Sequence, residues 1–459
     1  MENEGIRGKT KEKPEKFLFT DRELLLLIIP LVIELTLKLV VGMIDTIMVS
    51  SAGEAAVSGV SLVDSVIQLI IYILAAMASG GAVVAGQYLG SGNKLKAKEA
   101  SGELIWVNGL LALVITAIVF LVSGWITGSL FGEIEADVAQ YAKDYLLVVA
   151  SSIPAIAVFE VGTAIFRTMG NAKATMRISL FMNIINCIGN SIFIYGLSMG
   201  TRGAAISTVI ARWFSAVMIV VLLLDNRREL CIARTWKHHF NREMIGKILK
   251  IGVPNGVENG IFQIGKIALV GLAATFGTSA ITANAVTQTL AAIENIPGGA
   301  MQLAVVPVIA RCIGAGDCEQ AGHFNRKLLR ITYIAEMVTG IVMVLLLSPV
   351  LSIYRLSAET AALASSMFLW HTLGAVLLWP AAFILPASLR AAGDVRFPML
   401  ISIFSMWVFR FGGAYLLAGL LGMGAVGIWI SMSVMDWSFR AFIYCCRWHG
   451  GKWKLKRVV

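Results

Sequence analysis

The stretch Pro30-Leu-Val-Ile-Glu34 returns later in the chain as Pro254-Asn-Gly-Val-Glu258, and both copies lie inside long apolar segments. The offset that relates Pro30 to Pro254 also relates further pairs of residues along the chain: Gly53 and Gly277, Gly90 and Gly314, Gly92 and Gly316, Ala97 and Ala321, Gly203 and Gly427, and Trp213 and Trp437. Self-similarity at a fixed offset indicates an internal duplication. In an apolar chain, a duplication is typical of transporters, whose binding sites lie within or between the repeats.

The composition places the chain in a membrane. Hydrophobic residues make up 57% and charged residues only 14% of its 459 residues, and the mean hydropathy is +0.79. Soluble globular proteins contain about 25% charged residues. The apolar stretches are about 20 residues or longer, enough to cross a hydrocarbon core of about 30 Å as helices. We therefore expect an all-α polytopic membrane protein.

Twelve transmembrane helices are expected, six in each of two pseudo-symmetric lobes. Their expected ranges are 22–49, 57–86, 99–125, 138–168, 173–197, 200–224, 246–275, 280–310, 323–348, 359–391, 396–418 and 422–448. The N-lobe covers 21–224 and the C-lobe 246–448, with a tail at 1–20, a linker at 225–245 and a basic tail at 449–459. An even number of helices gives both repeats the same orientation in the membrane. Such lobes can rock against each other and expose a central cavity to each side in turn.

Lys and Arg gather in both tails, in the linker and in the even-numbered connections, whereas the odd-numbered connections carry almost none. Cytoplasmic loops carry such an excess. We therefore expect a multi-pass protein of the cell inner (plasma) membrane with both termini in the cytoplasm. The net charge of +10 is explained by this orientation, and no nucleic-acid partner is expected.

Nothing in the sequence favours an enzyme. The connections between the expected spans offer no polar catalytic loop and no paired His or Asp motif. The six cysteines show no CxxC spacing, so we expect free thiols and no metal centre. A carrier without a cofactor, acting as a monomer in the lipid bilayer, fits the duplication better than a channel or a receptor-like module does.

Asp45 is the strongest candidate for chemistry inside the membrane. A charge there costs about 2.5–3.5 kcal/mol on insertion scales and survives mainly where it faces a cavity or a partner. It lies in Val-Gly-Met-Ile-Asp-Thr-Ile-Met-Val, near the outer end of the first span. Its counterpart in the second repeat is Leu269, and this asymmetry indicates that one lobe binds the coupling ion. The alternative is that Asp45 caps the end of its helix.

Asn186 and Asn190 in the fifth span are four residues apart and therefore lie on one face of a helix. Amide oxygens and a carboxylate would form a hard-oxygen site suited to Na⁺, at Asp45, Asn186 and Asn190. The same carboxylate could instead carry a proton. The alternative is that the amides hydrogen-bond neighbouring helices, as Asn commonly does in membranes.

The repeated glutamates are candidates for a substrate cavity. Glu34 has Lys38 four residues later, where an ion pair within one helix can form. Glu258 has Phe262 at that position and is expected to have a freer carboxylate. Glu258 is therefore the better candidate for a cavity acid, and Glu34 for a structural ion pair.

Several segments, in their order and spacing, resemble the multidrug and toxic compound extrusion (MATE) family over nearly the whole chain after residue 20. They are Asp45-Thr-Ile-Met-Val, Gly86-Gln-Tyr-Leu-Gly-Ser-Gly-Asn93, Phe166-Arg-Thr-Met-Gly-Asn-Ala-Lys173, Gly203-Ala-Ala-Ile-Ser-Thr208, Gly252-Val-Pro254 and Ser388-Leu-Arg-Ala-Ala-Gly-Asp394. The resemblance implies a V-shaped, two-lobed antiporter for multidrug efflux, which exports small organic cations and other xenobiotics in exchange for Na⁺ or H⁺.

The resemblance also implies roles for particular residues. The acid of the family's first helix maps onto Asp45, its two helix 5 asparagines onto Asn186 and Asn190, and a helix 6 threonine onto Thr208. In the second lobe, the family's helix 7 glutamate falls on Phe262, which favours coupling through the first lobe.

Two alternatives remain from the sequence. One is a flippase for lipid-linked saccharides of the related superfamily, which should present several arginines in its cavity for a pyrophosphate; Arg410 and Arg440 are the candidates in the last spans. The other, less favoured, is a membrane-embedded enzyme.

Overall fold

The computed structural model describes residues 17–130, 135–232, 240–456 and 458–459. The expected tail at 1–20 is therefore described only from Phe17, and residues 233–239 of the expected linker lie outside the described ranges. Within these ranges every regular element is a helix.

The first repeat forms helices from residue 21 to residue 223. They are α1 (Asp21–Ser50), α2 (Glu54–Gly90), α3 (Lys94–Leu121), α4 (Ser123–Trp125), η1 (Ile126–Leu130), α5 (Ala136–Ala150), α6 (Ile153–Thr168), α7 (Ala172–Asn190), η2 (Ser191–Gly196) and α8 (Gly200–Leu223). The elements η1 and η2 are π-helical.

The second repeat forms helices from residue 242 onward. They are α9 (Arg242–Ala274), α10 (Thr278–Glu294), α11 (Ile296–Gly314), α12 (Cys318–Ile353), α13 (Ala358–Leu377), α14 (Trp379–Ala391), α15 (Arg396–Ser405), η3 (Met406–Gly412), η4 (Tyr415–Leu420), α16 (Gly424–Ile430), η5 (Ser431–Asp436), α17 (Trp437–His449) and η6 (Lys452–Leu455).

Length and hydropathy give fewer membrane spans than the twelve expected. Ten helices of the described chain qualify, or eleven when the pair α5 and α6, bent by 52°, counts as one span. The expected span 422–448 is helical from Gly424 onward as α16, η5 and α17, but it carries Asp436 and Arg440, which lower its hydropathy. The expected spans 280–310 and 359–391 are each divided into two helices, and α11 and α14 begin with Pro297 and Pro380 in their first turns.

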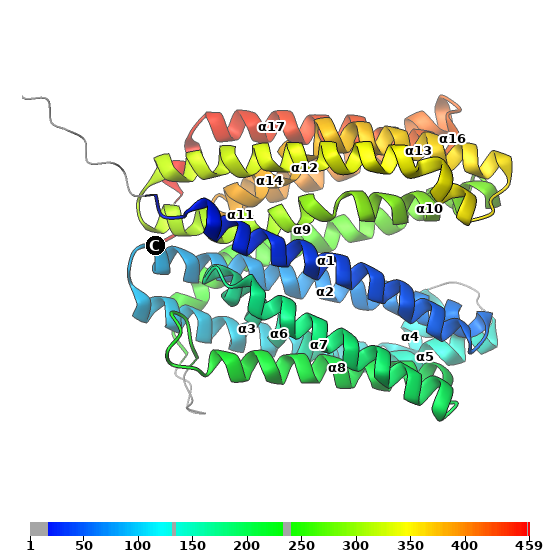
Figure 1. The fold of residues 1–459 in the computed structure, drawn as a ribbon, viewed down its shortest axis with the longest axis horizontal. Helices are drawn as coiled ribbons and strands as arrows, with labels where there is room; N and C mark the ends of the chain where they lie inside the picture. Colours follow the sequence, from blue (N-terminus) through cyan, green and yellow to red (C-terminus); the bar gives the residue numbers. More distant parts are fainter. Residues whose placement is uncertain (1–16, 131–134, 233–239, 457) are drawn as a thin grey trace, which may run out of the picture.

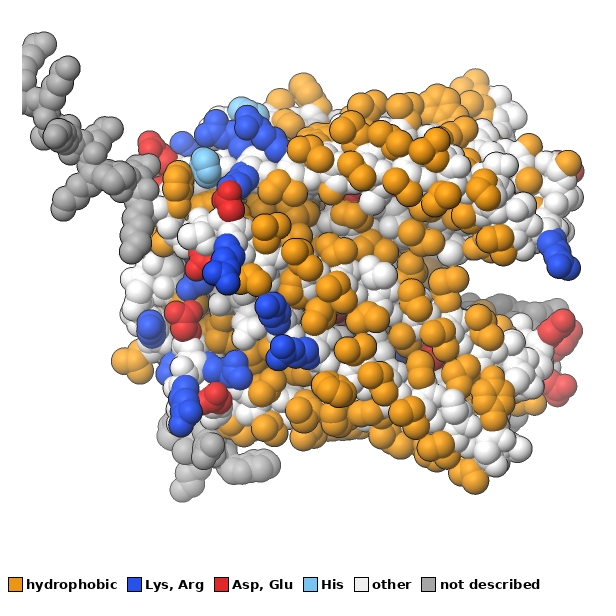
Figure 2. All heavy atoms as spheres, viewed as in Figure 1, with side chains coloured by type: hydrophobic (Ala, Val, Ile, Leu, Met, Phe, Trp, Pro, Cys, Tyr) orange, Lys and Arg blue, Asp and Glu red, His pale blue; other side chains and the backbone are white. Residues whose placement is uncertain are grey.

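The helices form two bundles that lie side by side (Figure 1). One bundle contains α1–α8, and the other contains α9–α17. Figure 2 shows that Lys and Arg side chains gather at one end, where α1 begins, and that the molecule is hollowed between the bundles at the opposite end. We call these the basic end and the open end.

Equivalent turns at the basic end explain part of the sequence repeat. Gly92 and Gly316 adopt φ angles of +78° and +79°, which favour glycine because it has no Cβ. The next residue in each turn caps the following helix: Asn93 accepts a hydrogen bond from the Lys96 N–H at 3.1 Å, and Asp317 from the Gln320 N–H at 2.8 Å.

The two bundles touch through symmetric contacts at the basic end. A Cβ on Gly90, the last residue of α2, would overlap the backbone of Arg311, and a Cβ on Gly314, the last residue of α11, would overlap the backbone of Gln87. The Gln87 side chain also donates to the Ala391 carbonyl oxygen at 2.9 Å. The structure is therefore closed at the basic end.

Candidate functional site

Asp45 lies half-buried in the last third of α1, facing α7 inside the N-lobe. The Asn190 side-chain nitrogen donates to Asp45 Oδ1 at 2.8 Å. Asn190 is buried, and its own side-chain oxygen has no hydrogen-bond partner among the described residues. This contact joins α1 to the last turn of α7, next to the π-helical segment η2.

Asn186 lies one turn earlier on α7 and faces the same carboxylate. With its amide nitrogen on the Asp45 side, it donates to Oδ1 at 2.7 Å and to Oδ2 at 3.0 Å, and its oxygen accepts from the Thr208 hydroxyl at 3.3 Å. This orientation is the one that satisfies both polar atoms of the Asn186 amide, because the opposite one would place its oxygen against two carboxylate oxygens. The structure thus brings together Asp45, Asn186, Asn190 and Thr208, from α1, α7 and α8.

Further charged residues surround this cluster. Asp64 on α2 and Arg212 on α8 are close enough to act on the charge of Asp45. Asp64 accepts a hydrogen bond from the Tyr145 hydroxyl at 3.2 Å, and Arg212 donates to the Ser152 hydroxyl at 3.0 Å. Arg212 is not among the residues predicted from the sequence, although an arginine one turn after Thr208 in an apolar span is a signal for it.

The donor atoms of the cluster fit a small hard cation or a proton. The described residues contain no group of three His, Cys, Asp or Glu side chains that could hold a metal ion. The atoms near Asp45 that could bind an ion are carboxylate and amide oxygens. Such oxygens suit hard cations. The unpartnered Asn190 oxygen is an available ligand atom beside the carboxylate.

Both repeated glutamates form ion pairs with an arginine. Glu34 accepts from Arg167 at 3.0 Å and from the Thr175 hydroxyl at 3.0 Å. Arg390 donates to both carboxylate oxygens of Glu258 at 2.9 Å. Glu34 therefore forms an ion pair, as expected, but with Arg167 of α6 and not with Lys38. The expectation that the Glu258 carboxylate is the freer of the two is wrong, because Glu258 is ion-paired with Arg390. Sequence spacing within one helix could not find these pairs, because the partners lie on other helices.

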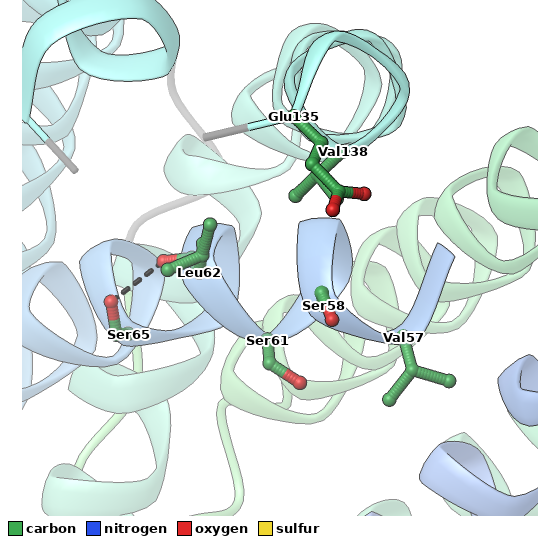
Figure 3. A pocket seen from close by; sticks show the side chains of 7 residues that line it. All are labelled: Val57, Ser58, Ser61, Leu62, Ser65, Glu135 and Val138. Carbon is green, nitrogen blue, oxygen red and sulfur yellow. Dashed lines mark hydrogen bonds between the residues drawn. The ribbon is translucent and has the colours of Figure 1, made fainter. Parts of the chain in front are cut away.

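One shallow pocket lies away from these residues. It has a volume of about 540 Å³ between the start of α2 and α5. Figure 3 shows Glu135 beside the α2 serines, of which Ser65 donates to the Leu62 carbonyl oxygen of its own helix at 2.6 Å. The pocket presents hydroxyls and one carboxylate, which has no basic partner among the residues that the structure describes, and it does not include the Asp45 cluster.

The chain matches known proteins over most of its length. The sequence profile of the MatE family matches it twice, over residues 30–192 and 254–416, and the two matches are related by the same offset as Pro30 and Pro254. The chain is 29% identical to "Uncharacterized transporter YisQ" of Bacillus subtilis over 94% of both chains. It is 23% identical to "Probable multidrug resistance protein NorM" of Thermotoga maritima, over 95% of this chain and 94% of that protein.

Solved structures share the fold. "Outward-facing conformation of a multidrug resistance MATE family transporter of the MOP superfamily" superposes with a TM-score of 0.87 at 21% identity, covering 94% of this chain and 96% of that one. "Crystal structure of MATE in the bent conformation" gives a TM-score of 0.86 at 20% identity, covering 95% and 96%. The expected all-α, two-repeat membrane fold is confirmed. Because the two profile matches cover more than half of its residues, the chain belongs to the MatE family, the multidrug and toxic compound extrusion transporters, and is a transporter and not an enzyme.

Proposed function

We propose that this transporter exports cationic amphiphilic compounds in exchange for Na⁺ or H⁺, with the coupling ion bound at Asp45, Asn186, Asn190 and Thr208. The observation that carries the proposal is the Asp45 carboxylate held by two amides of α7 within the membrane-spanning N-lobe. The relatives named as multidrug resistance proteins support the class of cargo.

The geometry suggests how an ion acts on helix α1. Both amide nitrogens face an ionised Asp45, which accepts their hydrogen bonds. A proton on this carboxylate would remove acceptor capacity, and Na⁺ would require the amide oxygens to turn toward the ion. Either event changes the contacts between α1 and α7. Competition of a cationic cargo for the same carboxylate would then be enough for exchange.

The orientation in the membrane belongs to the same proposal. The Lys and Arg side chains at the basic end support a cytoplasmic location for that end and for both termini, in a chain that spans the plasma membrane. The open end then faces outward, where the coupling ion enters. We propose that one copy of the chain is sufficient for transport.

The test is ethidium efflux from proteoliposomes under separately imposed Na⁺ and pH gradients. Wild type should export under one of the two gradients, and Asp45→Asn should lose that gradient-driven export. The matched control is Asp144→Asn, which removes a carboxylate from the surface ion pair with Arg202 and should export like wild type. Export by Asp45→Asn at the wild-type rate under either gradient would refute the assignment of the coupling site.

A further inference from the structure

Three cationic side chains of the C-lobe surround one aromatic ring. Lys266 Nζ lies 5.4 Å from the centroid of Phe262, and the guanidinium carbons of Arg410 and Arg440 lie 5.2 Å and 5.5 Å from it. Arg440 is also 4.5 Å from the ring centroid of Phe383. The cations come from α9, η3 and α17, so the tertiary fold and not local sequence brings them together.

The charges of this cluster do not balance. Arg410 and Arg440 are 7% and 3% exposed, and the described carboxylate beside them is Asp436, 3.7 Å from Arg410. Nearby Glu258 is matched by its own partner, Arg390. Three cations (Lys266, Arg410, Arg440) against one carboxylate leave a net charge of +2.

Part of the arginine hydrogen-bonding capacity is unused as well. Arg410 Nε, Arg440 Nε and Arg440 Nη1 are buried without a hydrogen-bond partner among the described residues. Arg440 Nη2 donates to the Ser402 hydroxyl at 3.2 Å. Buried charged donors without an acceptor are costly. An oxyanion would supply both the acceptors and the missing negative charge.

The repeat makes this cluster the counterpart of the Asp45 cluster with inverted charge. At the offset of the internal repeat, Arg410 stands where the N-lobe has Asn186, and Asp436 where it has Arg212. The contact of Asn186 with Thr208 becomes the contact of Arg410 with Met432, whose sulfur lies 2.7 Å from Nη2. Leu269 replaces Asp45. The same scaffold therefore presents a carboxylate in one lobe and guanidinium groups in the other.

We propose that Lys266, Arg410 and Arg440 form a binding site for an oxyanion group, a carboxylate, sulfonate or phosphate, carried by an amphiphilic molecule. A guanidinium matches the geometry of such groups with paired N–H donors. The rings of Phe262 and Phe383 would receive the apolar part of the ligand. Among the three cations, Lys266 is the exposed one, whereas both arginines are buried. The statement that the ligand is transported as cargo rests on the proposed transport function. The statement that the ligand binds to the site is independent of it.

The site also bears on the flippase alternative from the sequence. Arg410 and Arg440, the arginines that such a carrier should present, do lie together. The rings beside them favour an amphiphile over a small inorganic ion, and a lipid headgroup is one source of the same oxyanion chemistry.

The test measures binding to full-length protein in phosphatidylcholine nanodiscs by equilibrium dialysis. The probes are 2-naphthalenesulfonate and its uncharged analogue 2-naphthalenesulfonamide. The sulfonate should bind at least about tenfold more tightly, and Lys266→Gln and Arg440→Gln should each weaken it by about tenfold, as expected for a lost charge-assisted hydrogen bond. Arg202→Gln, which removes an exposed arginine of the N-lobe, is the matched control.

Two variants separate binding from folding and from transport. Lys266 is exposed, so Lys266→Gln should keep the wild-type unfolding temperature. Asp45→Asn should bind the sulfonate like wild type even if export of ethidium is lost. Equal binding of the two probes, no detectable binding of the sulfonate, or unchanged affinity in the Lys266→Gln/Arg440→Gln double variant would overturn the proposal.

Competition identifies the source of the anion. Displacement of the sulfonate by phosphatidylglycerol in the disc would support a site that takes lipid headgroups, and displacement by inorganic phosphate would support a site that takes the bare oxyanion. Bound sulfonate displaced by neither would support a site that requires an aromatic amphiphile.

Discussion

Single amide side chains play two different parts in the N-lobe. Asn190 donates to the Asp45 carboxylate. Asn108, on α3, donates to the backbone carbonyl oxygens of Leu74 and Ala157 at 3.3 Å and 3.4 Å, and so holds α3 against α2 and α6. The two residues are the same type and are both buried, which makes them a matched pair.

We predict opposite phenotypes for their alanine variants. Asn190→Ala should weaken the apparent affinity for the coupling ion by about tenfold or more in ethidium efflux assays, because it removes a hydrogen bond to a charged group. Asn108→Ala should keep that affinity and lower the free energy of unfolding by about 1–3 kcal/mol, measured as a fall in the unfolding temperature in detergent. If the ion dependence of efflux is unchanged in Asn190→Ala, Asn190 does not take part in binding the coupling ion.

The ion pair of Glu258 with Arg390 leads to a second prediction for single residues. Glu258→Gln leaves Arg390, whose side chain is 12% exposed, without a countercharge, and we expect a loss of about 3–5 kcal/mol in the free energy of unfolding. The double variant Glu258→Gln/Arg390→Gln should recover most of that loss. The repeat offers an internal comparison, since Glu34→Gln should behave in the same way through Arg167.

Transport by the Glu258 variants decides between two roles. If Glu258→Gln is stable but inactive, the residue is the cavity acid that the sequence favoured. If the double variant is both stable and active, the pair is structural and fixes α9 against α14.

At the scale of the elements, the close contact of the two bundles at the basic end depends on helices whose last residue is glycine. Gly90 ends α2 against the backbone of Arg311, and Gly314 ends α11 against the backbone of Gln87. We predict that Gly90→Ala and Gly314→Ala each destabilise this end by about 1–3 kcal/mol, because a backbone cannot move aside as a flexible side chain can. Disulfide crosslinking between cysteines introduced across the basic end of a cysteine-free background measures the effect, and its yield should fall.

Gly109, in the interior of α3, is the control. A Cβ there would meet no atom of the described residues within 4 Å, and Gly109→Ala should leave the crosslinking yield unchanged and raise helix stability by up to about 1 kcal/mol. A wild-type crosslinking yield in both Gly90→Ala and Gly314→Ala would show that the close approach of these two glycines to the opposite backbone does not stabilise the basic end.

At the scale of the whole molecule, the structure is closed at the basic end and hollowed at the other (Figure 2). Exchange by two rocking lobes requires the opposite arrangement in part of the cycle. Spin labels at Ser51 and Thr275, equivalent positions after α1 and α9, should therefore report a second, shorter distance when cargo is added in the absence of the coupling-ion gradient. The six native cysteines are free thiols and must be replaced first.

One unchanged distance distribution under all ion and cargo conditions would contradict rocking of the lobes. A label pair within one lobe, at Ser51 and Arg202, serves as the control, because both positions move with the N-lobe and should keep their separation.

Much of this arrangement could be predicted from the sequence. The constant offset between the repeats indicated the two lobes, and hydropathy indicated the membrane helices, because both signals can be read along the chain without knowing how it packs. Length and hydropathy give fewer spans of the described chain than the twelve expected, since α16, η5 and α17 carry charges that a span usually lacks. Asp45, Asn186 and Asn190 could be selected as candidates from the sequence, because a polar group in an apolar helix is costly unless it faces a cavity or a partner.

The sequence by itself determined which groups must find partners, and the tertiary structure alone decided which partners they found. Glu34 and Glu258 are ion-paired to arginines on other helices, with sequence separations of 133 and 132, and no spacing within one helix predicts that choice. Likewise, Lys266, Arg410 and Arg440 become one cluster only when three helices meet around Phe262. The sequence shows that a charged side chain lies in an apolar helix, where its burial costs free energy. Which opposite charge compensates it depends on distances between side chains, and only the packing of the helices sets these distances.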